Sequence, residues 1–133
     1  MSAVAIMRAL LVAHAPLTDL VPIDRIEAGD VSKGSLPAIG IKEISGIEQD
    51  TVARASNTLV TARVQVTVYA TSYPQQKAIL KAAKLGGGVF TGSVAGYSVR
   101  SVLRDLIGPD LSDNAAGTFE QSRDFKVAFI EPF

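Results

Sequence analysis

The most regular pattern of apolar and polar positions in the chain lies in Thr58–Thr71. Every second position in this segment is apolar and the positions between are polar; the apolar set is Val60, Ala62, Val64, Val66, Val68 and Ala70. A period of two in a segment rich in β-branched residues and free of Gly and Pro predicts a strand with one buried and one exposed face.

The length of this strand suggests a projecting element. Fourteen residues at roughly 3.3 Å each extend about 46 Å, whereas a compact domain of this size is only about 36 Å across. The strand must therefore bend, or one end must project beyond the body. A projecting hairpin arm would be suited to contact neighbouring molecules.

The segments before this strand predict a helix and shorter strands. Ser2–Ala15 has apolar residues at helical spacing and is expected to end at Pro16; its stripe is Ala3, Ile6, Met7, Leu10, Leu11 and His14. Arg25–Ala28 can form a short strand, and Leu36–Ile44 alternates well enough for a second one. Ser45–Asn57 is polar, and we interpret it as a long hairpin loop that orders on binding a partner, the alternative being an ordinary solvated loop.

The segments after the central strand predict one helix and two strands. Tyr73–Leu85 has Pro in its first turn and an expected buried stripe of Ala78, Ile79, Ala82 and Leu85. Tyr97–Ile107 and Phe119–Ile130 alternate as strands, separated by a turn at Gly108–Thr118. In the last strand, Phe125, Val127 and Phe129 are expected to face inward, with Asp124 and Lys126 outward.

The element order α-β-β-β-α-β-β predicts an α+β fold in a single domain, 1–133. We expect an antiparallel or mixed sheet of four to five strands, with a long β-hairpin and two helices packed on one face. The other face would be polar or available to another subunit, and would carry Arg63, Gln65, Thr67, Tyr69, Arg100 and Arg104.

Composition excludes several kinds of chemistry. The chain has no Cys, which excludes disulfides, Cys-ligated zinc and thiol nucleophiles. The single His14 has no visible catalytic partner, and GxSxG and HExxH motifs are absent. Gly86–Gly88 follows a predicted helix, whereas phosphate-binding loops precede one. We therefore expect no enzyme, no cofactor and no metal site, and no segment reaches the length of a membrane span.

Charge is balanced overall but unevenly distributed. The net charge is zero, which argues against a dedicated nucleic-acid binder. Thr51–Arg104 contains no acidic residue and seven basic ones, namely Arg54, Arg63, Lys77, Lys81, Lys84, Arg100 and Arg104, whereas the flanking segments are mainly acidic. Either basic strands pair with acidic strands inside one sheet, or an acidic surface of one copy meets a basic surface of the next.

Several segments together resemble a known family. They are AHAPLTDLVPIDRI after the first helix, then LPAIGI, then ARVQVTVYATSYPQQKAILKAA, and finally SRDFKVAF. In order and size this resembles the tail-completion, or tail-terminator, proteins of long-tailed bacteriophages. The resemblance implies an α+β protomer that assembles as a hexameric ring, caps the tail tube and joins it to the head-completion proteins of the neck. DNA would pass through the lumen without sequence recognition, and the protein would belong to the virion.

The resemblance leads to a set of expected interface residues. We expect the loop at Ser45–Asn57 to meet a neighbouring subunit or neck protein, and the polar sheet face to lie at a subunit contact or toward the lumen. The candidates are Ile47, Glu48, Gln49, Asp50, Arg54, Arg63, Gln65, Arg100 and Arg104. The alternatives are another head–tail connector or tail-tube protein, and a small ligand-binding domain or enzyme recognised by a deep apolar pocket.

Overall fold

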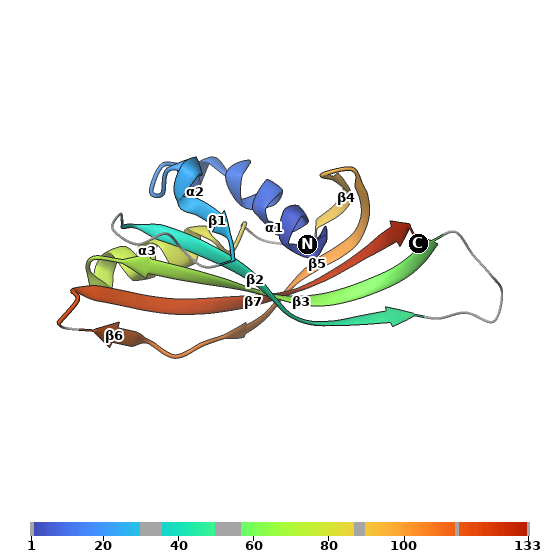
Figure 1. Ribbon diagram of the computed structural model, residues 1–133. Helices are drawn as coiled ribbons and strands as arrows, with labels where there is room; N and C mark the ends of the chain where they lie inside the picture. Colours follow the sequence, from blue (N-terminus) through green and yellow to red (C-terminus); the bar gives the residue numbers. More distant parts are fainter. Residues whose placement is uncertain (1, 30–35, 50–56, 87–89, 114, 133) are drawn as a thin grey trace.

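The computed structural model describes residues 2–29, 36–49, 57–86, 90–113 and 115–132. They form a twisted, mixed seven-stranded sheet with its helices on one face (Figure 1). The strand order is β1-β2-β3-β7-β5-β4, with β6 also on β7; β1 and β2 are parallel and the other pairs antiparallel. The elements are α1 (Ser2–Val12), α2 (Ala15–Thr18), η1 (Ile23–Arg25), β1 (Ile26–Ala28), β2 (Ala38–Gln49), β3 (Asn57–Ala70), α3 (Tyr73–Ala82), β4 (Phe90–Val94), β5 (Tyr97–Ile107), β6 (Leu111–Asp113) and β7 (Thr118–Pro132).

The strand predicted from the regular alternation is β3, the central strand. It is paired with β7 along its whole length and with β2 from Leu59 to Tyr69. The alternation is confirmed, because every apolar position from Val60 to Ala70 is buried while the intervening residues are not. These side chains pack with Phe125 and Phe129 of β7 and with Met7 of α1 in one aliphatic core.

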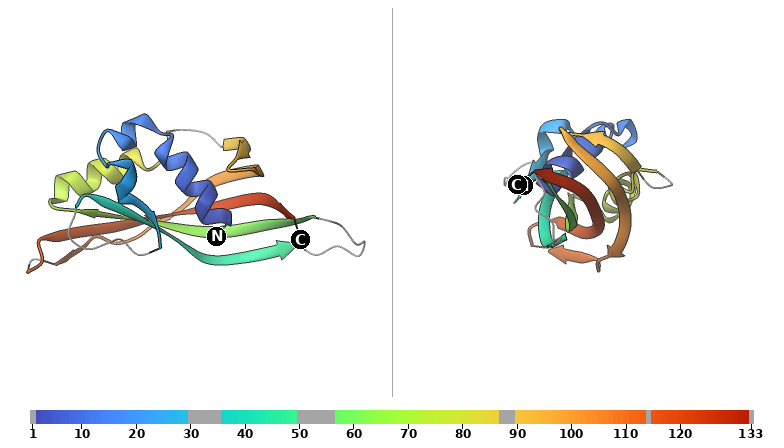
Figure 2. Two further views of the ribbon diagram at one scale, coloured as in Figure 1. Left: turned by 45° about the horizontal axis from the view of Figure 1, so that its top comes forward. Right: turned by 90° about the vertical axis from the view of Figure 1, so that its right-hand side faces the viewer.

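The length argument for β3 is also confirmed. The strand bends, and its first half projects beyond the helices (Figures 1 and 2). The projecting arm contains the second half of β2, the first half of β3 and the end of β7, and the start of β5 borders it, because Ser98 is opposite Ile130. The long loop expected at Ser45–Asn57 is wrong in its first part, because residues 45–49 continue β2; residues 50–56 lie outside the described ones.

The helices differ from the prediction in number and in the face they bury. Pro16 does not simply end a helix; it lies in the first turn of the short α2, where a missing N–H costs little. In α3, the buried residues are Gln76, Ile79 and Leu80, whereas Ala78 is exposed. The helix is therefore rotated relative to its apolar pattern, because a buried glutamine takes part in a polar network.

This network joins α3 to the segment between β5 and β6. Lys77 Nζ lies 2.6 Å from Asp110 Oδ1, and the Tyr73 hydroxyl donates to Asp110 Oδ2 at 3.0 Å. Gln76 Nε2 donates to Asp110 Oδ1 at 3.1 Å and lies 3.3 Å from Gln121 Oε1. The hydrogen bond from Lys77 lowers the pKa of Asp110, and the same contact raises the pKa of Lys77.

The expected four to five strands became seven because two segments pair unexpectedly. β4 forms a hairpin with β5 through Ala95 and Gly96, both at positive φ, and Ala-Gly is a weak turn signal. β6 lies within the predicted turn. It rejoins β7 after Gly108, whose N–H donates to the Ser122 carbonyl and where a Cβ would lie only 2.4 Å from Ser122 Oγ.

Phe125→Ala should be strongly destabilising. Phe125 is 1% exposed and lies opposite Val64 at the centre of the sheet. We expect a loss of about 3–5 kcal/mol in the free energy of unfolding, measured by urea titration. Phe90→Ala, at an exposed phenylalanine of the edge strand β4, is the matched control and should cost much less; equal losses would contradict this assignment of the core.

Asp110→Asn should reduce stability at neutral pH more than in acid. A carboxyl group whose folded pKa is depressed contributes stability above its unfolded pKa of about 3.8, and this contribution is lost as the pH falls through the lower folded pKa. The difference in urea midpoint between wild type and variant should therefore shrink from pH 7 to pH 3. A similar trend for Asp24→Asn, an exposed carboxylate, would contradict a specific role for Asp110.

Candidate interaction surface

No described helix covers the face of the sheet opposite α1 and α3, as the side view in Figure 1 shows. The strand register places alternate residues of four strands on this open face. Arg63 of β3 lies between Ser45 of β2 and Lys126 of β7, and Leu103 of β5 follows in the same row. The next row contains Lys42, Gln65 and Asp124.

Arg63 is engaged within its own sheet. Its Nη2 and Nε lie 2.6 and 2.9 Å from Asp124 Oδ2, and Asp105 Oδ2 is 3.6 Å from Nε. Asp124 is only 4% exposed, so its charge depends on this guanidinium. For this pair, the predicted pairing of a basic strand with an acidic strand inside one sheet is confirmed. Reversing the charge of Arg63 would consequently damage the fold and could not test assembly alone.

A shallow hollow of about 210 Å³ lies beside this ion pair on the open face. Gln65 forms part of its wall and approaches Ser122 Oγ at 3.5 Å. Pro109, between β5 and β6, and Leu111 of β6 also line the hollow, and Leu111 is about half exposed. The hollow thus combines amide and hydroxyl groups with an apolar rim.

The arm carries three of the predicted interface residues. Ile47 lies on the open face, opposite Thr61, and is 73% exposed. Glu48 points to the other face. The Gln49 carbonyl accepts a hydrogen bond from Thr58 Oγ1 at 3.3 Å. Asp50 and Arg54, also predicted, lie outside the residues that the structure describes.

Arg100 and Arg104 do not join Arg63. A bulge between Val99 and Ser101 contains the exposed Arg100 and breaks the strict alternation expected for this strand. Arg104 is opposite Phe125 on the helix side, and its Nη1 donates to the Gly86 carbonyl at 2.6 Å. The prediction that one polar face carries all these arginines is wrong, because the bulge shifts the phase of the strand.

Arg104 has a second arginine beside it. Arg123 is mostly buried on the same side of the sheet, and its Nε has no hydrogen-bond partner within the described part of the chain. Burial and the charge of Arg104 lower the pKa of Arg123. Two neighbouring guanidinium groups therefore give this end of the sheet a positive charge.

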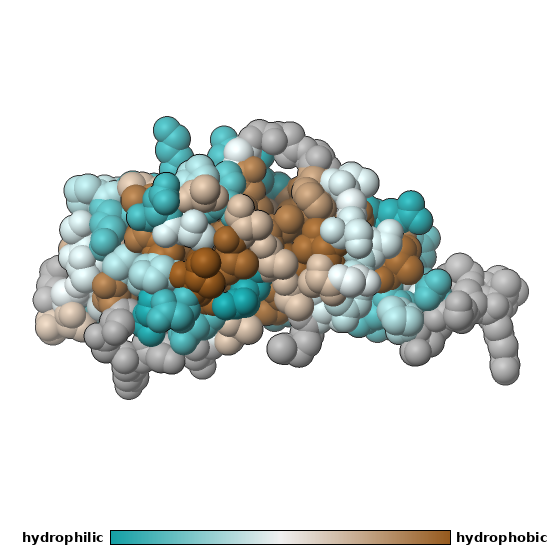
Figure 3. Space-filling view, turned by 90° about the horizontal axis from the view of Figure 1, so that it is seen from above, coloured by the Kyte–Doolittle hydropathy of each residue, from teal (hydrophilic) through white to brown (hydrophobic). Residues whose placement is uncertain are grey.

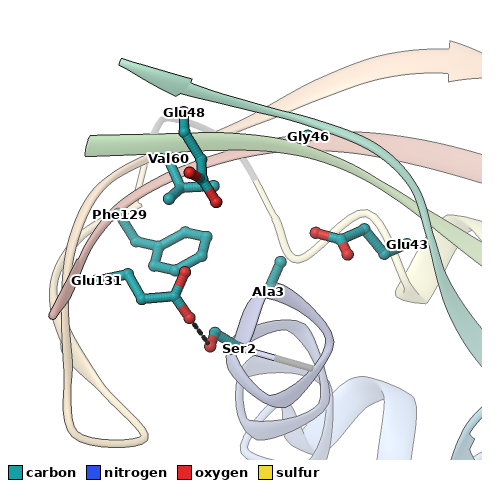
Figure 4. A pocket seen from close by; sticks show the side chains of 8 residues that line it. All are labelled: Ser2, Ala3, Glu43, Gly46, Glu48, Val60, Phe129 and Glu131. Carbon is teal, nitrogen blue, oxygen red and sulfur yellow. Dashed lines mark hydrogen bonds between the residues drawn. The ribbon is translucent and has the colours of Figure 1, made fainter. Parts of the chain in front are cut away.

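A pocket of about 310 Å³ lies between the arm and the start of α1 (Figure 4). Val60, Phe129 and Ala3 provide apolar walls, and three carboxylates surround them, those of Glu43, Glu48 and Glu131. Ser2 Oγ donates to Glu131 Oε1 at 2.6 Å. Glu43 and Glu48 are exposed and meet no cation among the described residues, so this end of the sheet is negative.

The acidic partners of the arginines and this pocket were not predictable from the sequence pattern. The alternation in the last strand placed Asp124 outward, but nothing local could identify Arg63 as its partner. No group of three or more His, Cys, Asp or Glu in the described ranges could hold a metal ion. None of the described helices is both long and apolar enough to cross a membrane. The described surfaces offer charged and apolar side chains on rigid strands, an arrangement that can bind another protein.

Comparisons with known proteins show the fold. No protein-family model matches the sequence, and no curated protein matches it significantly. Among solved structures, the chain is similar to one from the "Virion of native gene transfer agent (GTA) particle". The TM-score is 0.64 at 14% identity, and the match covers 97% of each chain. The two chains therefore share one architecture from end to end.

The Arg63–Asp124 pair should show energetic coupling. Arg63→Met leaves a buried carboxylate without its cation and should cost about 1–3 kcal/mol in urea unfolding. The double variant with Asp124→Asn should be more stable than the sum of the single losses by at least about 0.5 kcal/mol. Lys126→Met, at the exposed neighbour of Arg63, should change stability by no more than about 0.5 kcal/mol. Strict additivity would contradict the pair.

Proposed function

We propose that this chain is a structural protein of a phage-like particle, and specifically a tail terminator that caps the tail tube as a ring. The observation that carries the proposal is the end-to-end similarity to a chain of a gene transfer agent virion, with 97% of each chain covered. The sequence resemblance to tail-completion proteins supports the finer assignment. The expected ring is hexameric, and its partners would be the tail-tube protein on one side and a head-completion protein on the other.

The geometry suggests how such a protein would act. A ring on the tip of the tube would occupy the surface to which the next tube subunit binds, and elongation would stop. The strands of the arm are paired with one another, so the arm can reach a neighbour without ordering a flexible segment first. Zero net charge would let DNA slide through the lumen, because strong phosphate binding would obstruct it.

The predicted interface residues divide between two roles in this proposal. Ile47, Glu48 and Gln49 would contact a neighbouring subunit or neck protein from the arm. Thr91 Oγ1 donates a hydrogen bond to the backbone carbonyl of Arg100. The Arg100 side chain is exposed and could contact a partner. A head–tail connector or a tube subunit could use the same fold, and the position of the protein in the particle would distinguish these assignments.

The protein should form a ring, alone or on tail tubes. Light scattering over a range of concentrations should give six times the chain mass of 14.0 kDa, and electron microscopy should place the ring at one end of purified tubes. Arg100→Glu should weaken assembly, whereas Lys81→Glu, an exposed change on α3, should not. A protein that stays monomeric and does not bind tubes would overturn the proposal.

A further inference from the structure

The sheet has two open edges, which lie at opposite ends of the molecule. β1 covers β2 only as far as Ile41, so no described strand pairs with the outer edge of residues 43–49. β4 covers β5 only as far as Val102, and residues 103–107 likewise pair only with β7 among the described strands. Open strand edges expose unpaired peptide groups and invite another strand.

Both edges also carry large aliphatic side chains. Ten large hydrophobic residues in the described ranges are exposed, and half of them lie on these two edges rather than being scattered. They are Ile44 and Ile47 on β2, and Leu103, Leu106 and Ile107 on β5. Natural edges that avoid pairing usually carry Lys or Pro instead. The bulges at Ile44 and Leu106 would limit pairing to short segments on either side.

The charges of the two edges are complementary. Glu43 and Glu48 of β2 and Arg104 of β5 are all on the helix side of the sheet, as is the neighbouring Arg123. The glutamates have no cation and the arginines no carboxylate within the described part of the chain. If the β2 edge of one copy met the β5 edge of another, the unmatched groups would lie on the same side of one continuous sheet.

The directions and positions of the strands fit a contact that repeats. β2 and β5 run in opposite directions, because each neighbouring pair from β2 through β3 and β7 to β5 is antiparallel. Copies placed side by side would therefore pair in an antiparallel manner. Ile47 and Leu103 both lie on the open face, level with Ala128 and Lys126 of β7 respectively. Pairing Ile47 with Leu103 would therefore shift each copy by two residues, a stagger of about 7 Å.

This stagger is compatible with a closed ring. The four strands from β2 to β5 span about 19 Å at about 4.8 Å each. A stagger of about 7 Å per copy then tilts the strands by about 20° from the ring axis. Contact between two different edges is heterologous and can close into a ring, whereas contact between two β2 edges would stop at a dimer.

We propose that copies of this chain associate head to tail through strand pairing between the outer edge of β2 in one copy and that of β5 in the next. The occupant of each edge is thus a second copy. The proposal rests on the proposed function for its placement in a tail ring, but the pairing itself can be tested separately.

Two charged-edge variants test the pairing by complementation. Ile44→Lys with Ile47→Lys should disable the β2 edge, and Leu106→Lys with Ile107→Lys the β5 edge. Each variant should remain monomeric in light scattering, while an equimolar mixture should give heterodimers of twice the chain mass, because one intact pair of edges remains. Leu20→Lys with Ile23→Lys, at exposed positions on the helix side, is the control and should assemble as wild type. Far-UV circular dichroism and urea unfolding confirm folding.

Cysteine cross-linking provides a measurement that does not depend on disrupting the contact. The chain has no Cys, so Ile47→Cys and Leu103→Cys, both on the open face, each introduce one thiol. A short bismaleimide should cross-link the two variants into a dimer when they are mixed. The variant with both cysteines should give a series of cross-linked oligomers, because each copy can be linked at both edges. Self-linking of Ile47→Cys alone would indicate a two-fold contact and overturn the proposal.

The outcomes separate this proposal from the proposed function. Assembly of both edge variants as rings would overturn the strand pairing and leave the terminator assignment standing. Rings that form through the paired edges but do not bind tail tubes would support the strand pairing and contradict the terminator assignment. Absence of any association or cross-link, with or without tubes, would overturn both.

Discussion

The continuous pairing of β3 with its two neighbours is the constraint on which the rest of the structure depends. Its alternate residues define a dry face and an open face for the whole sheet, because adjacent strands in register present the same face. A slip of one residue would expose Val64 and bury Arg63. The helices can cover only the dry face, so the open face and the arm are left for contacts with other molecules.

Polar groups inside the fold are placed where the sheet is irregular. Gln76 and Lys77 attach α3 to Asp110, in the interruption between β5 and β6, and Gly108 permits that interruption by close approach to Ser122. Arg63 neutralises the nearly buried Asp124 across two strands. Arg63 was predicted from the sequence to lie at an interface, but in the structure it forms an ion pair within its own chain. Within the described residues, Glu43 and Glu48 meet no cation and Arg104 and Arg123 no carboxylate, and these groups mark the two ends of the sheet.

The surfaces of the molecule suggest assembly in more than one direction. In the proposed ring, the open sheet edges would join copies side by side, and the arm would project along the strands toward an axial neighbour. The helix side is also partly apolar (Figure 3), with exposed Leu20 and Ile23. The proposed tail terminator would need contacts of both kinds, lateral between like subunits and axial to different ones.

The sequence by itself determined the central strand, its buried face, the approximate positions of both main helices and the projection of the arm. Those features follow from periodicity and length, which are local properties of the chain. It could place Arg63 and Gln65 on one face, but not identify Asp124 as the partner of Arg63. The tertiary structure decided the register, the bulges that put Arg104 on the opposite side, the added strands β4 and β6, and which edges stay open. Those depend on pairing between residues far apart in the chain, which no local pattern specifies.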